Sequence, residues 1–89
     1  MVSTISLLEK ALEMRKAAQW SERFNITRAT ITMAKKKGRL SPTLAGAFAR
    51  EIGADPVYWT AVAAYEAEPE TPLKHLIAPY IESQQSKIP

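Results

Sequence analysis

Two proline-containing cap signals, Ser41-Pro42 and Asp55-Pro56, divide the middle of this 89-residue chain into short segments. A serine or aspartate side chain can accept hydrogen bonds from the free N–H groups at the start of a helix. Proline suits the first helical position because its missing N–H is not needed there. Each pair follows a glycine, and glycine commonly ends the preceding helix. Short helices are therefore expected, and no stretch of the chain reads as a strand.

Other cap residues mark the helices that come earlier in the chain. The first helix is expected over about residues 5–14, with Ser3 or Thr4 as its cap. Asn25 can adopt the left-handed conformation that ends a helix, so a second short helix is expected just before it. Thr27 is expected to cap a third helix, which stops at a glycine.

A proline-rich break over residues 68–72 separates the last segment from the rest. Within that segment Pro79 is expected to end or kink the helix near Ala78, because proline cannot donate the helical hydrogen bond. The chain is thus predicted to be all-α, with a five-helix domain over residues 1–68 and a short C-terminal helical appendage over residues 69–89. The core is expected to contain the largest aromatic side chains: Trp20, Phe24, Phe48 and Trp59.

Charge is distributed unevenly, although the net charge is only +3. Up to residue 50 there are ten basic and three acidic residues, a balance of +7. From residue 51 onward two lysines oppose six acidic residues, a balance of −4. Such asymmetry favours a basic face that meets a polyanion, and the alternative is two solvated surfaces that merely differ.

Several classes of protein are disfavoured by what the sequence lacks. It has no cysteine, so disulfides, thiolate metal sites and thiol nucleophiles are excluded. His75 is the only histidine, and neither a glycine-rich phosphate loop nor a metal-ligand spacing occurs. We therefore expect no enzyme, no cofactor and no metal. No apolar run is long enough to span a membrane and no signal peptide is recognisable, so a cytoplasmic location is expected.

The stretch AAQWSERFNITRATITMAKKKGRLSP, residues 17–42, resembles the helix-turn-helix of the lambda repressor/Cro-like (XRE) DNA-binding family. Ser21 occupies the position of a small residue, where two helices cross closely, and Asn25 stands where glycine usually makes the turn. Ile26 and Ile31 match the aliphatic positions that hold the second helix against the first. Ala34 stands where a larger residue is frequent, so other side chains must fill that space. The resemblance covers about residues 5–67 and implies a lambda-repressor-like domain.

The residues of the third helix separate into two faces by their spacing. If Ile31 and Ala34 face inward, four others lie together on the outward face and are expected to read base edges: Arg28, Ala29, Thr32 and Met33. Contacts to phosphate are expected from neighbouring hydroxyls and cations: Lys16, Thr27, Thr30, Lys35, Lys36, Lys37 and Arg39. The alternatives are that Arg28 and the lysine run are solvated surface residues and that Met33 fills a gap in the core.

An apolar pattern at helical spacing also occupies the C-terminal appendage. Together with a residue of the fifth helix it is expected to form the interface of a homodimer: Trp59, Leu73, Leu76, Ile77, Tyr80 and Ile81. Helix-turn-helix proteins commonly bind DNA as dimers. The alternative is that these residues only seal the core of a single chain.

The expected function is a sequence-specific, double-stranded DNA-binding transcriptional regulator, a phage or prophage repressor that binds a palindromic operator as a homodimer. The segment GADPVYWTAVAAYEAE, residues 53–68, resembles small phage-related regulators and favours an immunity repressor of a filamentous (Pf-type) prophage. One alternative is an antitoxin that regulates its own operon and binds a toxin through its C-terminal region. Another is a protein-interaction module that does not bind DNA. A small protein partner is compatible with the first two of these three functions: an anti-repressor with the repressor, and a toxin with the antitoxin.

Overall fold

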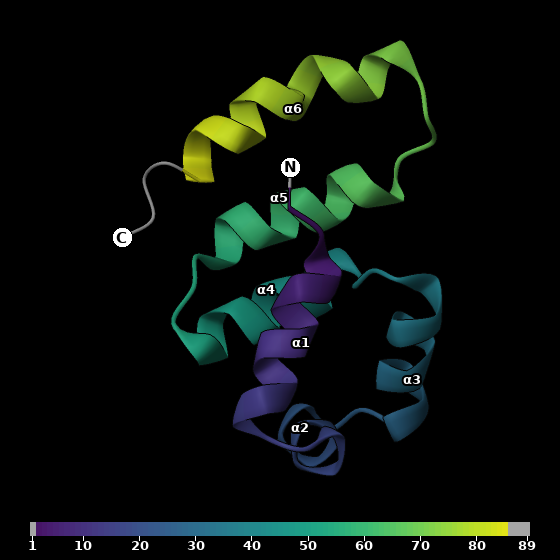
Figure 1. Ribbon diagram of the computed structural model, residues 1–89, viewed down its shortest axis with the longest axis vertical. Coiled ribbons are helices and arrows are strands. Elements are labelled where there is room, and N and C mark those ends of the chain that lie inside the picture. The colour runs from purple at the N-terminus through teal and green to yellow at the C-terminus, as the bar shows by residue number, and fades with distance from the viewer. Residues whose placement is uncertain (1, 86–89) are drawn as a thin grey trace.

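Six helices make up the part of the chain that the computed structural model describes, residues 2–85. They follow one another in the order α1 (Thr4–Met14), α2 (Ala17–Phe24), α3 (Arg28–Lys37), α4 (Pro42–Ile52), α5 (Pro56–Ala67) and α6 (Pro72–Gln85) (Figure 1). No strand occurs among these residues, which confirms the expectation of an all-α chain. The last four residues of the expected appendage, 86–89, lie outside the described residues.

Most helix ends fall where their cap residues predict. Asn25 ends α2 in the left-handed conformation, with φ 53° and ψ 47°, and it is the only non-glycine residue with positive φ in the described part of the chain. Gly38 and Gly53 end α3 and α4 with φ of 75° and 84°. The Ser41 hydroxyl accepts a hydrogen bond at the start of α4, and the Asp55 carboxylate accepts two at the start of α5. These ends are local features, so the sequence alone predicts them.

Two expectations about helix ends are met only in part. Thr27 is the N-cap residue of α3, as expected, but its side chain makes no cap hydrogen bond and its hydroxyl lies 3.2 Å from that of Thr30 instead. Pro79 does not end the last helix near Ala78, since α6 continues through it. Pro79 is exposed, and its missing N–H removes one hydrogen bond from the helix.

Aromatic side chains fill the space among the first four helices. Trp20 and Phe48 are buried, and their ring centroids lie 5.1 Å apart in an edge-to-face arrangement. Phe24 packs against both rings at 5.4 and 5.1 Å. The indole N–H of Trp20 donates to the carbonyl of Ala11 at 2.8 Å, so this buried polar group is satisfied. The expected core positions of these three aromatic residues are confirmed.

Helices α4 and α5 pack closely at one glycine. A Cβ atom placed on Gly46 would lie 2.5 Å from the Oγ1 atom of Thr60, which is closer than van der Waals contact allows. The absence of a side chain at Gly46 therefore permits this approach between the two helices.

A buried hydroxyl joins three segments that lie far apart in the sequence. The Thr4 side chain is fully buried, donates a hydrogen bond to the Glu66 carboxylate and accepts one from the backbone N–H of Leu40 at 2.8 Å. The same carboxylate accepts a hydrogen bond from the Ser3 hydroxyl at 2.8 Å and one from the Thr4 N–H at 3.1 Å. Ser3 also caps α1, as expected, by accepting from the Ile5 N–H. The negative charge of Glu66 thus lies at the positive end of the α1 dipole.

Replacing Thr4 with valine removes this hydroxyl but keeps the shape of the side chain. We expect a loss of about 1–3 kcal/mol in the free energy of unfolding, because the buried N–H of Leu40 loses its acceptor. Urea unfolding followed by circular dichroism measures the change. Ser6→Ala is the matched control, since the Ser6 hydroxyl is exposed and donates only to a neighbouring carbonyl. Equal effects of the two substitutions would contradict a special role for Thr4.

Candidate nucleic-acid interface

Helix α3 has one buried side and one exposed side. Ile31 and Ala34 face inward, with 1% and 7% of their surface exposed. The four residues expected to read bases all lie on the exposed side: Arg28, Ala29, Thr32 and Met33. Met33 is 47% exposed, so the alternative that it fills a gap in the core is excluded. Ala34 is smaller than the residue frequent at this position, and the aromatic rings of α2 and α4 belong to the same core cluster and fill the space around it.

A short turn holds α3 against α2. The backbone N–H of Ile26 donates to the carbonyl of Ser21 at 3.0 Å across the left-handed Asn25. Ser21 is buried, and its hydroxyl donates to the carbonyl of Ala17 at 2.9 Å, so this polar residue is satisfied where the two helices meet. These contacts fix the start of α3 relative to α2.

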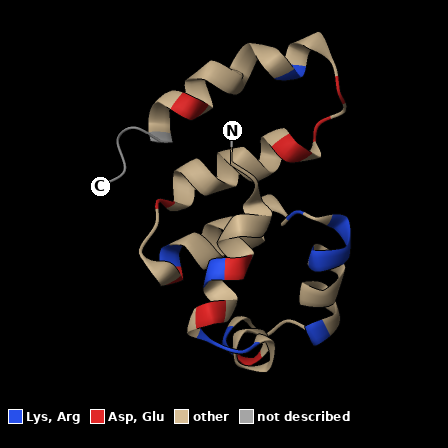
Figure 2. Cartoon of the chain, viewed as in Figure 1, with Lys and Arg blue, Asp and Glu red and all other residues tan. Residues whose placement is uncertain are grey.

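Cations gather at the other end of α3. The last turn of the helix and the residue after its terminal glycine expose four of them: Lys35, Lys36, Lys37 and Arg39. Positive charge at a helix C-terminus is favourable, and α3 contains no acidic residue. Figure 2 shows this basic end apart from the acidic residues of α5 and α6. Lys16 is exposed at the start of α2, a helix that lies beside the first turn of α3 rather than the last (Figure 1).

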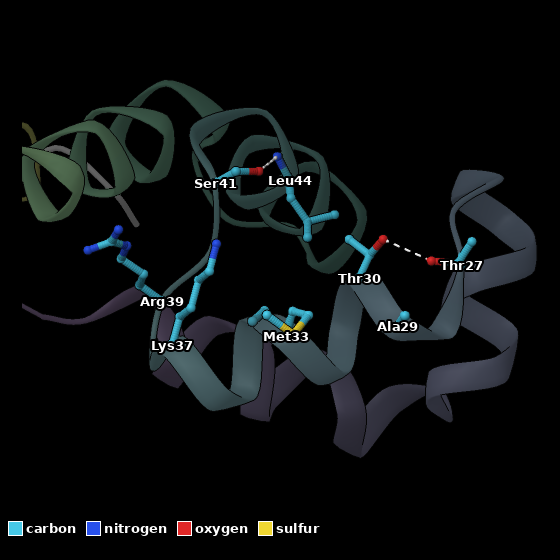
Figure 3. A pocket seen from close by; sticks show the side chains of 9 residues that line it. Thr27, Ala29, Thr30, Met33, Lys37, Arg39, Ser41 and Leu44 are labelled. Atoms are coloured by element: carbon cyan, nitrogen blue, oxygen red, sulfur yellow. Dashed lines mark hydrogen bonds between the residues drawn. The ribbon is translucent and has the colours of Figure 1, made fainter.

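An open hollow of about 380 Å³ lies between α3 and the start of α4 (Figure 3). It is lined by Thr27, Ala29, Thr30, Met33, Ala34, Lys37, Arg39, Ser41 and Leu44. The two cations stand at one end of the hollow and the two threonines at the other, with Met33 between them (Figure 3). Sequence reasoning missed Ser41 and Leu44 as parts of this surface. The sequence signal that could have indicated them is the Ser41-Pro42 cap, because it predicts that α4 starts only three residues after the glycine that ends α3.

Arg23 is a cation of this half of the chain that does not project freely. Its guanidinium donates to the Glu51 carboxylate and links α2 to α4, while Arg50 approaches the same carboxylate at 3.7 Å. The hydrogen bond from Arg23, with the nearby positive charges, lowers the pKa of Glu51 below its ordinary value of 4.5. Because this charge is compensated within the protein, Arg23 is not part of the free basic surface.

The residues expected at a dimer interface fall into two groups. Ile81 is only 8% exposed and packs on Tyr58 and Val62, so the expectation of an interface is wrong for Ile81, which seals the core instead. Trp59 is half-buried and packs within the molecule as well. The other four members remain exposed on α6: Leu73, Leu76, Ile77 and Tyr80. Ile81 differs from them because it turns toward α5.

Comparison with known proteins found no matching family model, no matching curated protein and no matching solved structure. Among residues 2–85 no group of three metal-ligating side chains comes together. Within the same range no helix is long and apolar enough to cross a membrane. The interpretation of the surface around α3 therefore depends on its own residues.

The pairing of Arg23 with Glu51 makes a prediction about pH. Arg23→Met should raise the pKa of Glu51 toward 4.5, because its main hydrogen-bond donor is lost. A carboxylate with a lowered pKa stabilises the fold above its ordinary pKa, and this contribution is lost as the pH falls through the lowered value. As the pH falls from 4.5 to the lowered pKa of Glu51, the free energy of unfolding should therefore decrease more in the wild type than in Arg23→Met. An NMR titration of the Glu51 carboxyl carbon measures the shift, and an unchanged midpoint in Arg23→Met would contradict the pairing.

Proposed function

We propose that this protein is a sequence-specific, double-stranded DNA-binding transcriptional regulator with a lambda-repressor-like helix-turn-helix formed by α2 and α3. One observation carries the proposal. Helix α3 buries Ile31 and Ala34 while its opposite side is exposed, free of acidic residues and followed by clustered cations. A helix with these properties suits the major groove, which is wide enough to admit it.

The start of α3 carries the side chains proposed to recognise bases. Arg28 is exposed in the first turn, where a guanidinium can donate two hydrogen bonds to the O6 and N7 atoms of a guanine. Ala29 and the methyl group of Thr32 can contact thymine methyl groups, and Met33 adds a flexible apolar side chain beside them. The Thr32 hydroxyl lies 3.2 Å from the carbonyl of Arg28, which turns its donor back to the helix and leaves the methyl group for contact.

The surfaces on either side are proposed to bind phosphates. The lysine run and Arg39 supply charge at the end of α3, and Lys16 supplies it at the start of α2. In the hollow between α3 and α4, the hydroxyls of Thr27 and Thr30 lie opposite the cations (Figure 3). These contacts hold the protein on the duplex without reading sequence.

The biological role we propose is that of a phage or prophage repressor in the bacterial cytoplasm, which binds a palindromic operator as a homodimer. The support for a prophage role, and for a filamentous prophage in particular, is the resemblance of residues 53–68 to small phage-related regulators. The support for a homodimer is the row of exposed apolar side chains on α6, which the rest of residues 2–85 leaves uncovered.

The affinity for an operator should fall steeply with salt. Each phosphate neutralised by Lys or Arg contributes about −0.9 to the slope of log affinity against log salt. A site selected from random duplexes provides the operator, and fluorescence anisotropy at several salt concentrations gives the slope. A slope near zero would contradict DNA binding through the basic end of α3.

Two alanine variants separate base recognition from phosphate binding. Arg28→Ala should cost about 1–3 kcal/mol on the operator and relax the preference at one base pair in each half-site. Lys36→Ala should weaken binding to all sequences alike and make the salt slope shallower by about 1 for each phosphate that Lys36 neutralises. Both side chains are exposed, so circular dichroism should show the same helix content in both variants.

Measurement of both variants against single-base changes of the operator tests this assignment. If Arg28→Ala keeps the full base preference, Arg28 does not read a base, and recognition passes to the other outward side chains of α3.

A further inference from the structure

Two separate apolar clusters hold the helices of the described chain together. The larger cluster contains the buried side chains of α1 to α4 together with Ala63 of α5. The smaller cluster contains Tyr58 and Val62 of α5 and Ile81 of α6. Among the α6 side chains over residues 72–84, Ile81 is the only one that is buried. The attachment of α6 therefore depends on the smaller cluster and not on the main core.

The smaller cluster contains a buried hydroxyl that has no hydrogen-bond partner. Tyr58 is 1% exposed, and nothing within residues 2–85 bonds to its hydroxyl. Burial, together with the negative charge of Glu82 on α6, raises the pKa of this hydroxyl above its ordinary value of 10.0. A buried polar group without a partner opposes the packing that buries it, because water bonds to the group once it is exposed. The contact between α5 and α6 is weakened accordingly.

Most of the α6 surface makes no buried contact that holds the helix in place. Pro79 inside the helix is exposed, and its missing N–H removes one helical hydrogen bond. Four large apolar side chains of α6 are 46–74% exposed: Leu73, Leu76, Ile77 and Tyr80. These side chains lose little when α6 moves away from α5.

Polar contacts hold the other end of α6 near the turn that follows α5 (Figure 1). The hydroxyl of Tyr65 lies 3.3 Å from Nδ1 of His75, and Nε2 of His75 meets the Glu70 carboxylate. The Lys74 ammonium lies 3.7 Å from the same carboxylate and 4.7 Å from the centre of the Tyr65 ring. All of these groups belong to the turn or to the helix ends beside it, so the contacts can persist while the far end of α6 moves.

We propose that α6 is a hinged strap, which lifts off α5 at its Ile81 end while the body formed by α1 to α5 stays folded. The turn over residues 68–71 is the hinge. In the closed state Ile81 packs on Tyr58 and Val62, and the Tyr58 hydroxyl has no partner. In the open state that hydroxyl bonds to water, which offsets part of the loss from exposing apolar surface. The balance is close because one buried side chain of α6 is set against one buried hydroxyl of α5.

Opening changes the surface that the molecule presents. It uncovers the side of α5 that carries Tyr58 and Val62, and it moves the exposed apolar row of α6 relative to the body that carries α3. The strap thus controls both a covered apolar surface and the position of an exposed one. The inference goes beyond the proposed function, because opening concerns a single chain and requires neither DNA nor a second copy.

Hydrogen exchange of the full-length chain, followed by mass spectrometry in dilute solution, tests the proposal. The amides of α6 should exchange at least roughly tenfold faster than those of α1 and α4, because local opening requires less free energy than global unfolding. Tyr58→Phe removes the hydroxyl that lacks a partner and should slow the exchange of α6 roughly 5- to 30-fold. Tyr80→Phe is the matched control, because Tyr80 is 74% exposed, and it should leave the exchange of α6 unchanged.

A second pair of variants acts in the opposite direction. Ile81→Ala removes most of the buried α6 side chain and should bring the exchange of α6 close to that of an unfolded peptide, while the exchange of α1 and α4 stays unchanged. Ile77→Ala is the matched control, because Ile77 lies on the same helix but is 46% exposed, and it should leave α6 protected.

Four results would each overturn the proposal. The amides of α6 could exchange as slowly as those of α1 and α4 in the wild type. Tyr58→Phe could leave the exchange of α6 unchanged or make it faster. Ile81→Ala could unfold the body together with α6. Finally, protection of α6 could rise with the concentration of the chain, which would show that a second copy rather than α5 holds the helix.

Discussion

One buried hydroxyl, that of Thr4, links three segments of the fold that lie far apart in the sequence. Thr4 begins α1, yet its side chain bonds to the loop before α4 through Leu40 and to α5 through Glu66. A small domain has a thin core, so a buried hydrogen-bond network that joins three segments contributes a large part of its specificity. Without this link α1 would retain its apolar contacts but lose the feature that aligns it with the loop and with α5.

The hydrogen bond between Thr4 and the Leu40 N–H also fixes the backbone that follows α3. Leu40 is buried, and Arg39 before it is exposed, so the backbone between them passes from the core to the basic end of α3. At the other end of α3, the left-handed Asn25 and the satisfied hydroxyl of Ser21 fix the turn from α2. The outward side of α3 is thus held at both ends while its own side chains make few contacts within the protein. The DNA recognition proposed for α3 needs this combination of a fixed backbone and free side chains.

Local signals are predictable from the sequence, and long-range partners are not. Asn25, Gly53 and Asp55 act on residues within one helical turn, and their positions in the structure match the prediction. The partners of Thr4 lie 36 and 62 residues away, and no pattern in the sequence connects them.

The same limit applies to the site and to the C-terminal helix. The outward side of α3 follows from helical spacing, because Ile31 and Ala34 mark the inward side. In α6 the same reasoning cannot separate Ile81 from the exposed row, because both satisfy an apolar pattern and only the position of α5 decides which side is buried. The expectation that Pro79 ends the helix is wrong, since α6 continues through it, and the expectation of a kink there stays a prediction.

Gly46 acquires a wider meaning from its place between α4 and α5. Any larger residue there must either turn the Thr60 side chain away or push the two helices apart. The second change would move α5, together with the α6 helix that packs on it, relative to α4. In the proposed homodimer, whose exposed apolar row lies on α6, the spacing of the two DNA half-sites would then depend on a residue that is not itself proposed to contact DNA.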